Sequence, residues 1–420
     1  MSDRWEWLTL ADVLEKQNNG KSIQQGWSPK CHDFPAESGA WGVLKTTAIQ
    51  AGSFEPIHNK KLPERLDPKP QIQVAAGDLL ITCAGPRSRC GVPALVRATP
   101  PRLMMSGKMY RFRPDVRVDA RFLEYWLLSP RAQKLIDTMK TGISESGLNL
   151  THSRFVRLPV PVPPLDEQRR IVDLLEDHLS RLDAADQDLE SCNRRLGALQ
   201  RSALAALHEG DSRLLGDLAV EAGYGTSAKC AVDGSGTPVV RIPNLVEGRI
   251  DLTDEKRVVD ISADVAKSAL AEGDLLIVRT NGSVDLIGRS AVVQPGINAA
   301  FASYLIRYRL RDELVRPAWV QAMLNTPQVR AQIVTLAASS AGQHNLSLAK
   351  LNGVQLPVPG LDAQDAGLRR LNELEDERKR LVAMVSASQI RAISLRRSLL
   401  AAAFSGRLTA TSDVEDLVSP

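Results

Sequence analysis

The sequence lacks the long apolar stretch that would cross a membrane and the paired cysteines that would form a disulfide framework. No run of about 18 apolar residues occurs, so no membrane span is predicted. The charged N-terminus, with Asp3, Arg4 and Glu6, is unlike a secretory signal peptide. The five cysteines form no Cys-x-x-Cys pair, which predicts reduced thiols and a cytoplasmic protein. A metal site at Cys83 and Cys90 is the alternative to two small buried apolar side chains.

Catalytic signatures are also missing. Gly20-Lys21-Ser22 has the ending of a phosphate-binding loop but not its upstream glycine. No Gly-x-Ser-x-Gly nucleophile elbow occurs, and the six histidines show no metal-binding spacing. The Asn-Pro-Pro-aromatic signature of amino-methyltransferases is absent as well. We therefore expect a chain that has no catalytic residues and binds no metal.

The charge is nearly balanced, with 53 basic and 49 acidic residues, but it is unevenly distributed. Residues 1–154 have an excess of lysine and arginine, whereas residues 155–210 have an excess of aspartate and glutamate. The positive first segment fits contact with phosphate groups.

The sequence repeats itself once, with a shift of 196 residues. Gly77-Asp78-Leu79-Leu80-Ile81 recurs as Gly273-Asp274-Leu275-Leu276-Ile277, and Gln168 maps onto Gln364 at the same shift. One shift that serves such distant matches indicates an internal duplication. A period this long indicates a whole domain with an appendage rather than a solenoid. Two copies favour a pseudo-twofold arrangement.

Each copy contains the same order of expected elements. In the first copy, a strand over Leu79–Thr82 and a short helix over Ala120–Ser129 precede a proline-rich segment, Leu158–Pro164. In the second copy, the corresponding strand and helix are Leu276–Arg279 and Pro317–Asn325. Proline excludes a helix in the proline-rich segment, so an extended path is expected to lead into the long helix that follows.

A long helix follows each globular part. Asp166 is expected to cap the first helix, and Gly210 and Gly406 stand where helix-terminating glycines belong. Apolar residues spaced alternately by four and three positions predict a coiled-coil seam of about five heptads. The positions expected to pair the helices and to dock other subunits are Ile171, Leu175, Leu182, Leu189, Leu196 and Leu199, and in the second helix Leu371, Leu374, Leu381, Val385, Leu395 and Leu399.

These patterns predict an α+β chain in which two pseudo-symmetric mixed α/β domains are separated by two long antiparallel helices that form a coiled coil. The expected divisions are 1–155, 156–210, 211–353 and 354–410, followed by a disordered tail over 411–420. The alternative is that each helix packs on its own domain, but the predicted helix, at roughly 60 Å, is longer than the face of such a domain.

Two motifs resemble those of a known family. The segment Leu158–Ile171, LPVPVPPLDEQRRI, resembles a conserved-region motif of type I restriction–modification specificity subunits. The segment Leu395–Thr409, LRRSLLAAAFSGRLT, is similar to the C-terminal signature of that family, and the two-copy order is similar as well. The second copy departs from the first motif over Gly360–Asp365.

The resemblance implies a DNA-specificity subunit without enzymatic activity. It implies two target recognition domains, each of which reads one half of a bipartite DNA site, and paired helices that set the spacing. It also implies two methylation subunits, which carry S-adenosylmethionine, and two restriction subunits, which use ATP and Mg²⁺; no cofactor is expected on this chain. Because residues 20–70 and 220–265 do not match each other, an asymmetric target is expected.

Contacts with DNA are expected in loops that bear Arg, Lys, Asn and Gln, whose donors and acceptors match base edges. The first choice is the pair of loops after the duplicated strand, the second is the Gly/Ser/Asn loops, and the third is the turns after Lys45 and Arg241. Loops shared by the two copies are expected to touch phosphates, since contacts common to two specificities carry no sequence information. The candidates are Lys45, Thr46, Arg87, Ser88, Arg89, Ser146, Asn149, Arg241, Asn244, Arg279, Asn281, Ser283, Gln343, His344 and Asn345.

Two other functions stay open at this point. The chain could serve a related restriction–modification type, such as a type IIB-like system. It could also be a coiled-coil adaptor that joins two protein-binding domains and binds no DNA. Selection of a split DNA sequence by the chain with its methylation subunit separates the adaptor from the other two.

Overall fold

The computed structural model describes residues 5–16, 20–207, 210–259, 265–340 and 343–408, so the expected tail lies outside the described residues. The chain divides into two compact units, one formed by Met1–Asp188 with Ala387–Pro420 and the other by Leu189–Ser386. Helices α4 (Leu165–Ala206) and α8 (Leu361–Ala403) each contribute one part to either unit. Within the described residues, no helix is both long enough and apolar enough to span a membrane.

A four-stranded sheet forms the centre of the globular part of the first unit. Strand β7 (Leu79–Thr82) pairs antiparallel with β11 (Met109–Phe112) and β9 (Pro93–Leu95), in the order β2-β11-β7-β9. Alternate residues of a strand point to opposite faces. Leu79 and Ile81 therefore join one hydrophobic cluster, and Leu80 joins another.

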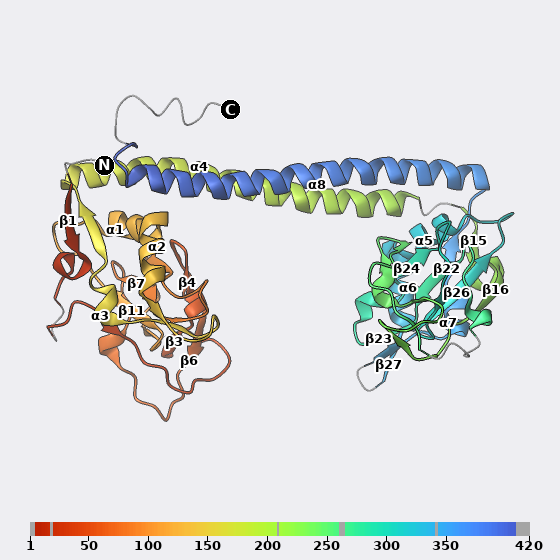
Figure 1. Ribbon diagram of the computed structural model, residues 1–420, viewed down its shortest axis with the longest axis horizontal. Coiled ribbons are helices and arrows are strands. Elements are labelled where there is room, and N and C mark those ends of the chain that lie inside the picture. Colours follow the sequence, from red (N-terminus) through yellow and green to blue (C-terminus); the bar gives the residue numbers. More distant parts are fainter. Residues whose placement is uncertain (1–4, 17–19, 208–209, 260–264, 341–342, 409–420) are drawn as a thin grey trace. The chain divides into compact units, whose positions relative to one another are not determined.

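Two short helices cover the sheet face that carries Leu79 and Ile81 (Figure 1). Helix α1 (Ala120–Leu128) begins after Asp119, whose carboxylate accepts from the backbone N–H of Arg121. Helix α2 (Pro130–Met139), which the sequence interpretation missed, begins at Pro130. Proline suits this first helical position because its missing N–H would have no helical partner. Pro130 therefore starts a second helix as well as following the first.

The second unit repeats this arrangement. Its sheet has the order β16-β26-β22-β24, with β22 (Leu275–Val278) antiparallel to β26 (Leu305–Leu310). Strand β22 begins one residue earlier than expected from the sequence. Helices α5 (Pro317–Leu324) and α6 (Pro327–Leu336) correspond to α1 and α2, and Pro327 again starts a helix that was not predicted. The duplicated sequence thus folds twice into the same local structure.

The proline-rich segments are extended, as predicted. In the first unit, β14 (Pro159–Val162) pairs antiparallel with β1 (Glu6–Thr9). In the second unit, β29 (Gln355–Pro357) pairs with β15 (Ser212–Leu214). Both pairs are two-stranded ribbons, so every strand in them is an edge strand. An edge strand tolerates proline because the missing N–H can lie on the side that pairs with no other strand. Helix α4 then begins at Leu165, one residue before the expected cap, Asp166.

The remaining elements are short. Those of the first unit are β2 (Gln24–Gln25), β3 (Gly42–Leu44), β4 (Ile49–Gln50), β5 (Ser53–Phe54), β6 (Asn59–Lys61), β8 (Ala84–Gly85), β10 (Leu103–Met104), β12 (Lys140–Thr141), β13 (Leu148–Leu150) and α3 (His152–Phe155), with 3-10 helices at Leu10–Val13, Thr46–Ala48 and Pro70–Ile72. Those of the second unit are β16 (Ala219–Tyr224), β17 (Cys230–Ala231), β18 (Val239–Val240), β19 (Leu245–Val246), β20 (Arg249–Ile250), β21 (Arg257–Val258), β23 (Thr280–Asn281), β24 (Ser290–Val292), β25 (Ala300–Phe301), β27 (Ala338–Ser340), β28 (Gln343–Asn345) and α7 (Leu348–Asn352), with 3-10 helices at Leu215–Leu218, Ile242–Asn244, Ala266–Ser268 and Val284–Leu286.

Candidate nucleic-acid interface

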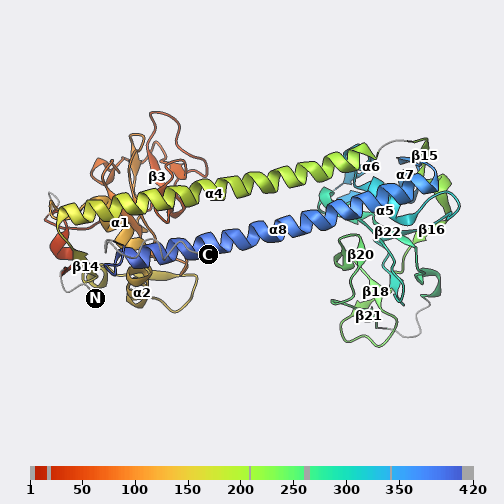
Figure 2. The same cartoon turned by 90° about the horizontal axis from the view of Figure 1, so that it is seen from above.

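In the first unit, the start of α4 lies against the end of α8 (Figure 2). Leu175 of α4 is fully buried in the same hydrophobic cluster as Leu399 of α8. Further along, the guanidinium of Arg396 forms ion pairs with Asp183, at 2.6 Å, and with Asp186, at 2.8 Å. Early residues of one helix meet late residues of the other, so the two helices are antiparallel here.

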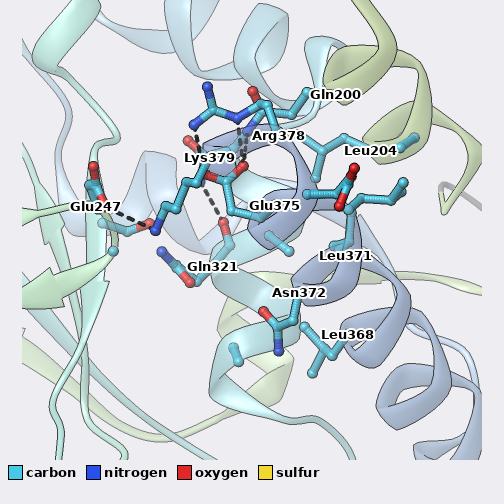
Figure 3. A pocket seen from close by; sticks show the side chains of 18 of the residues that line it. Gln200, Leu204, Glu247, Gln321, Leu368, Leu371, Asn372, Glu375, Arg378 and Lys379 are labelled. Carbon is cyan, nitrogen blue, oxygen red and sulfur yellow. Dashed lines mark hydrogen bonds and ion pairs between the residues drawn. The ribbon is translucent and has the colours of Figure 1, made fainter. Parts of the chain in front are cut away.

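In the second unit, the end of α4 lies against the start of α8. The amide of Gln200 donates to the carboxylate of Glu375 at 3.1 Å, and the same carboxylate accepts from Arg378 at 2.7 and 2.8 Å (Figure 3). The hydrogen bond from Arg378 holds the pKa of Glu375 below its usual value. Leu207 and Leu368 pack against the core of the same unit. The pairing is again antiparallel, as the sequence predicts.

Burial along the seam is uneven. Ile171, Leu175, Val385 and Leu399 are buried, whereas Leu199 is 56% exposed and Leu395 is 42% exposed. The half-buried seam positions are Leu182, Leu189, Leu196, Leu371, Leu374 and Leu381. Leu395 was expected to face α4, but it is the side chain of the next residue, Arg396, that contacts α4. The docking role of the exposed leucines stays a prediction.

A cavity of about 790 Å³ separates α8 from the globular part of the second unit. Residues from the end of α4, the start of α8, α5 and the β19–β20 hairpin line it (Figure 3). An ion pair of 3.3 Å between Lys379 of α8 and Glu247 of the hairpin crosses its edge. This exposed ion pair gives α8 a further contact with its domain beyond the junction where the helix begins.

A buried glutamine joins α4 to the first globular part. Gln168 has no exposed surface. Its side-chain oxygen accepts from the backbone N–H of Asp119, while its NH₂ group donates to the carbonyls of Arg117 and Pro163, each at 2.8 Å. The amide therefore connects the loop before α1 with the first turn of α4.

Gln364 makes the same connection in the second unit, and it is also fully buried. Its oxygen accepts from the N–H of Arg316 at 2.9 Å, and its NH₂ group donates to the carbonyls of Leu314, at 3.1 Å, and Pro359, at 2.7 Å. Three matching hydrogen bonds at the same repeat shift show that the duplication preserves the junction between each domain and its helix.

The C-terminal motif closes the helix end of the first unit. Phe404 is 4% exposed, and its ring contacts Trp126 and Phe122 edge-on at centroid distances of 5.2 and 5.3 Å. The indole of Trp126 donates to the carbonyl of Pro159. Phe404 therefore anchors the end of α8 on α1.

Arg111-Phe112-Arg113 recurs as Arg307-Tyr308-Arg309 at the same repeat shift, and both segments belong to the framework. Arg113 contacts the carboxylate of Asp78 at 2.7 Å, and Arg309 contacts that of Asp274 at 3.0 Å. Both carboxylates are almost completely buried. Because a buried charge needs a partner, the guanidinium groups of these two arginines are engaged as the partners of the buried carboxylates.

The first-choice and second-choice loops lie together in both copies. In the first copy, β8 pairs with β13, which carries the exposed candidate Asn149. In the second copy, β23 pairs with β28, which brings Arg279 and Asn281 next to Gln343, His344 and Asn345. Residues far apart in the sequence thus converge on one small sheet in each domain.

Several candidates of the first copy already have partners within the protein. Arg87 makes paired hydrogen bonds to the carboxylates of Glu145 and Asp137, which raise the pKa of Arg87 and lower that of Glu145. Arg89 donates to Gln50 and to the carbonyl of Thr46. The candidates that are exposed are Lys45, Arg87, Ser88, Ser146 and Asn149, and of these Arg87 is already paired with carboxylates.

In the second copy, the guanidinium of Arg279 donates to the side-chain oxygen of Asn345 at 3.0 Å and lies 4.8 Å above the ring of Tyr224. Asn244 is 1% exposed, and its side chain holds the surrounding loop through backbone groups. The side-chain oxygen of Asn281 accepts from the N–H of Ser283. Asn244 has no exposed edge to offer to DNA in this conformation.

The cysteines offer no metal centre among the described residues, where no group of three or more metal-binding side chains occurs. Cys83 and Cys90 are both buried, and burial raises the pKa of Cys83 to about 12. A thiol with such a pKa stays protonated at neutral pH, which suits a small apolar side chain.

The chain was compared with protein families and with curated relatives. The family described as "Type I restriction modification DNA specificity domain" matches residues 2–191. The chain is 24% identical over 396 residues to the type I restriction enzyme StySPI specificity subunit of Salmonella potsdam, which covers 90% of this chain and 85% of that relative. It is 32% identical over 192 residues to the EcoEI specificity subunit of Escherichia coli, which covers 45% of this chain and 31% of that relative.

The fold agrees with solved structures. A chain from a structural study of complex assembly and conformational transition in the type I R-M system superposes with a TM-score of 0.73 at 18% identity, covering 97% of this chain and 99% of that one. The HsdS subunit from Thermoanaerobacter tengcongensis gives a TM-score of 0.55 at 18% identity and covers 97% of this chain and 98% of that one.

Residues 2–191 thus match the specificity domain of type I restriction–modification systems, and the chain is similar over most of its length to type I specificity subunits. The sequence interpretation identified the two domain–helix junctions but missed what holds them. Gln168 and Gln364 were noted only as repeat matches, although a polar residue repeated at the entrance of both helices was a signal for a buried framework role. Phe404 lay inside the recognised C-terminal motif, whereas Lys256 lay outside the loops from which the DNA-contact candidates were chosen.

Proposed function

We propose that the chain reads a bipartite, asymmetric DNA target, with one half-site for each target recognition domain. The observation that carries this proposal is the duplicated junction: each domain is joined to a long helix by the same buried glutamine, and the helices pair antiparallel within each unit. Two domains of one fold whose residues 20–70 and 220–265 differ suit two unlike half-sites.

The roles that we propose for the parts of the chain are those expected from the sequence. Residues 1–155 and 211–353 form the recognition domains, residues 156–210 and 354–410 form the spacing helices, and two methylation subunits dock on those helices. Two restriction subunits join through the methylation subunits. The chain itself is non-catalytic, binds no cofactor and works in the cytoplasm, where it reaches chromosomal DNA; S-adenosylmethionine, ATP and Mg²⁺ belong to its partners.

The single most informative experiment is reconstitution of the chain with its cognate methylation subunits, followed by selection of methylated duplexes from a randomised pool. We expect a split motif of two unlike half-sites separated by a spacer of fixed length. Mapping of methylated bases in a host that carries the complex should return the same motif. A pool without a split motif would favour a protein-binding adaptor, and methyl transfer by the isolated chain would contradict the non-catalytic assignment.

The mode of DNA cleavage by the restriction partner distinguishes a type I complex from a type IIB-like system. A type I complex should need ATP for cleavage and should cut away from its target. Cleavage at fixed positions on both sides of the target, without ATP, would favour the type IIB-like system while leaving the DNA-reading role intact.

A further inference from the structure

The second recognition domain contains a small polar pocket of about 340 Å³, separate from the cavity beside α8. The pocket lies where the chain passes from β17 to β18 and where the end of β25 meets Thr226, whose backbone bridges to Ala302. Its lining includes three hydroxyl side chains, Thr226, Ser227 and Ser303, and the phenol of Tyr304. Hydroxyl donors of this kind suit an oxygen-rich ligand.

Two cations line the same pocket. The guanidinium of Arg241 uses one nitrogen, Nη2, to contact the carbonyl of Asp254 at 2.6 Å and the carboxylate of Asp254 at 3.0 Å. Among the described residues, Nη2 is the only one of its three guanidinium nitrogens that has a partner, and Nε is buried without one. Lys256 is half-buried, and no carboxylate of the described part of the chain pairs with its ammonium group.

The local charge is positive overall. Asp254 is the one carboxylate that pairs with a lining cation in the described part of the chain, and its side chain is 70% exposed, whereas that of Arg241 is 13% exposed. A third cation stands next to the pocket, because Arg279 donates to the backbone carbonyl of the lining residue Ser303. A half-buried site with surplus donors and surplus positive charge favours an anion.

The first domain repeats the key position. Lys45 corresponds to Arg241 at the shift of 196 residues, and each directly follows a strand in parallel pairing, β3 or β18, and precedes a 3-10 helix. Lys45 is exposed, and its ammonium group forms no ion pair with the described residues. A cation that recurs in two domains of different specificity suits a contact that carries no base information, namely one with the DNA backbone.

We propose that Arg241 and Lys256 form a binding site for one DNA backbone phosphate, completed by the pocket hydroxyl groups of Thr226, Ser227 and Ser303. This inference rests on the proposed DNA-reading function. The Nη1 group of Arg241, which has no partner among the described residues, is free to donate to phosphate oxygens, and the Lys256 ammonium adds a second charge. The site sets the register of the second domain on its half-site and reads no bases.

The test is the salt dependence of DNA binding by the complex of the full chain with its methylation subunits. Arg241→Gln and Lys256→Gln are compared with Lys229→Gln, an exposed lysine of the same domain that lies outside the pocket. Each pocket variant should weaken binding several-fold, equally for the selected target and for unrelated duplexes. Each should also flatten the plot of log K against log salt by up to about 0.9, the slope that one phosphate contributes.

The double variant Arg241→Gln/Lys256→Gln distinguishes one shared phosphate from two separate ones. A shared phosphate predicts a total slope change of about 0.9, and about twice that value would overturn the shared site. Arg241→Lys should restore the slope, because it keeps the charge. A slope equal to that of Lys229→Gln, or a changed target sequence in either single variant, would also overturn the proposal.

A second measurement needs no substitution and so avoids any folding defect. Cys230 lines the pocket and is half-buried. Duplex DNA should slow alkylation of Cys230 in the wild-type complex, and an unchanged rate in the presence of saturating DNA would contradict an occupied pocket. If the wild-type complex selects no split DNA motif, the proposed function itself fails; if it selects one while Cys230 and the slopes stay unaffected, only the pocket assignment fails.

Discussion

Replacement of Gln168 by methionine should destabilise the first unit strongly. Methionine fills a similar volume but can neither donate to the carbonyls of Arg117 and Pro163 nor accept from the N–H of Asp119. Each buried backbone group left without a partner costs about 1–3 kcal/mol. Three such groups, reduced by some local relaxation, predict a loss of about 3–5 kcal/mol in the free energy of unfolding.

Urea denaturation followed by tryptophan fluorescence measures this loss. Five of the six tryptophans lie before residue 130, so the signal reports mainly the first unit. Gln187→Met, at an exposed position of the same helix, is the matched control and should change stability by less than about 0.5 kcal/mol. Gln364→Met should produce a comparable loss in the second unit, where Trp319 is the reporter.

The reasoning about the junction would be refuted by a loss below about 1 kcal/mol for Gln168→Met, because the buried groups would then have found other partners. It would equally fail if Gln187→Met were as harmful, since the effect would then come from the helix and not from the amide. Target selection by a folded Gln168→Met complex also reports how firmly the first domain is positioned on its helix. When this junction loosens, we expect the complex to accept a wider range of spacer lengths.

Four further perturbations follow from the same contacts. Phe404→Ala should cost about 3–4 kcal/mol in urea denaturation by removing the edge-on contacts that anchor α8; an unchanged midpoint would contradict this packing. Arg396→Met should cost about 1 kcal/mol at low salt and less in 1 M NaCl, whereas a loss that salt does not reduce would not be electrostatic. Burial raises the pKa of Glu124, so the stability that this carboxyl contributes is present below its unfolded pKa and is lost as pH rises through its folded pKa. Between pH 4 and pH 7, the stability of Glu124→Gln should therefore rise relative to that of wild type. A relative fall would contradict a carboxyl whose pKa is raised by burial. Lys45→Gln should flatten the salt dependence of DNA binding by up to about 0.9 without changing the selected target, and a changed half-site would make Lys45 a base reader.

The duplication and the long helices could be predicted because they depend on patterns that the sequence displays directly. A repeated Gly-Asp-Leu-Leu-Ile segment gives a buried strand twice, since the apolar run and the glycine before it need no distant information. The heptad-like spacing likewise gives helices α4 and α8. Their exact facing residues were harder to predict: Leu395 fits the spacing, but Arg396 faces α4 because Asp183 and Asp186 lie opposite it.

Helices α2 and α6 were missed because proline after a helix was interpreted as a stop alone. Ser129 and Thr326 cap these helices, as their hydroxyl groups accept from the N–H groups of Ala132 and Val329. A Ser-Pro or Thr-Pro pair therefore predicts a helix start as well as an end. The sequence contains this signal in both copies, so the omission was one of interpretation.

The choice of DNA-contacting residues was limited by a physical fact: residue type does not reveal whether a side chain is already engaged. Arg87 was selected as a flexible basic residue, yet Asp137 and Glu145, distant in sequence, occupy its guanidinium. Asn244 was selected for its amide, which the surrounding loop uses entirely within the fold. Only the tertiary structure separates such engaged groups from residues such as Lys45, whose ammonium group forms no ion pair with the described residues.

The two copies of the domain provide an internal criterion for sorting residues by role. A polar residue that recurs and is buried, such as Gln168 with Gln364, maintains the framework, because both copies need the same junction whatever DNA they read. An exposed polar residue without a counterpart can specify bases. Lys45 and Arg241 fit neither group, since they recur as cations at the protein surface or in a pocket open to it. A position that must be positive in both domains while their targets differ is explained by the one feature that every duplex shares, its phosphate backbone.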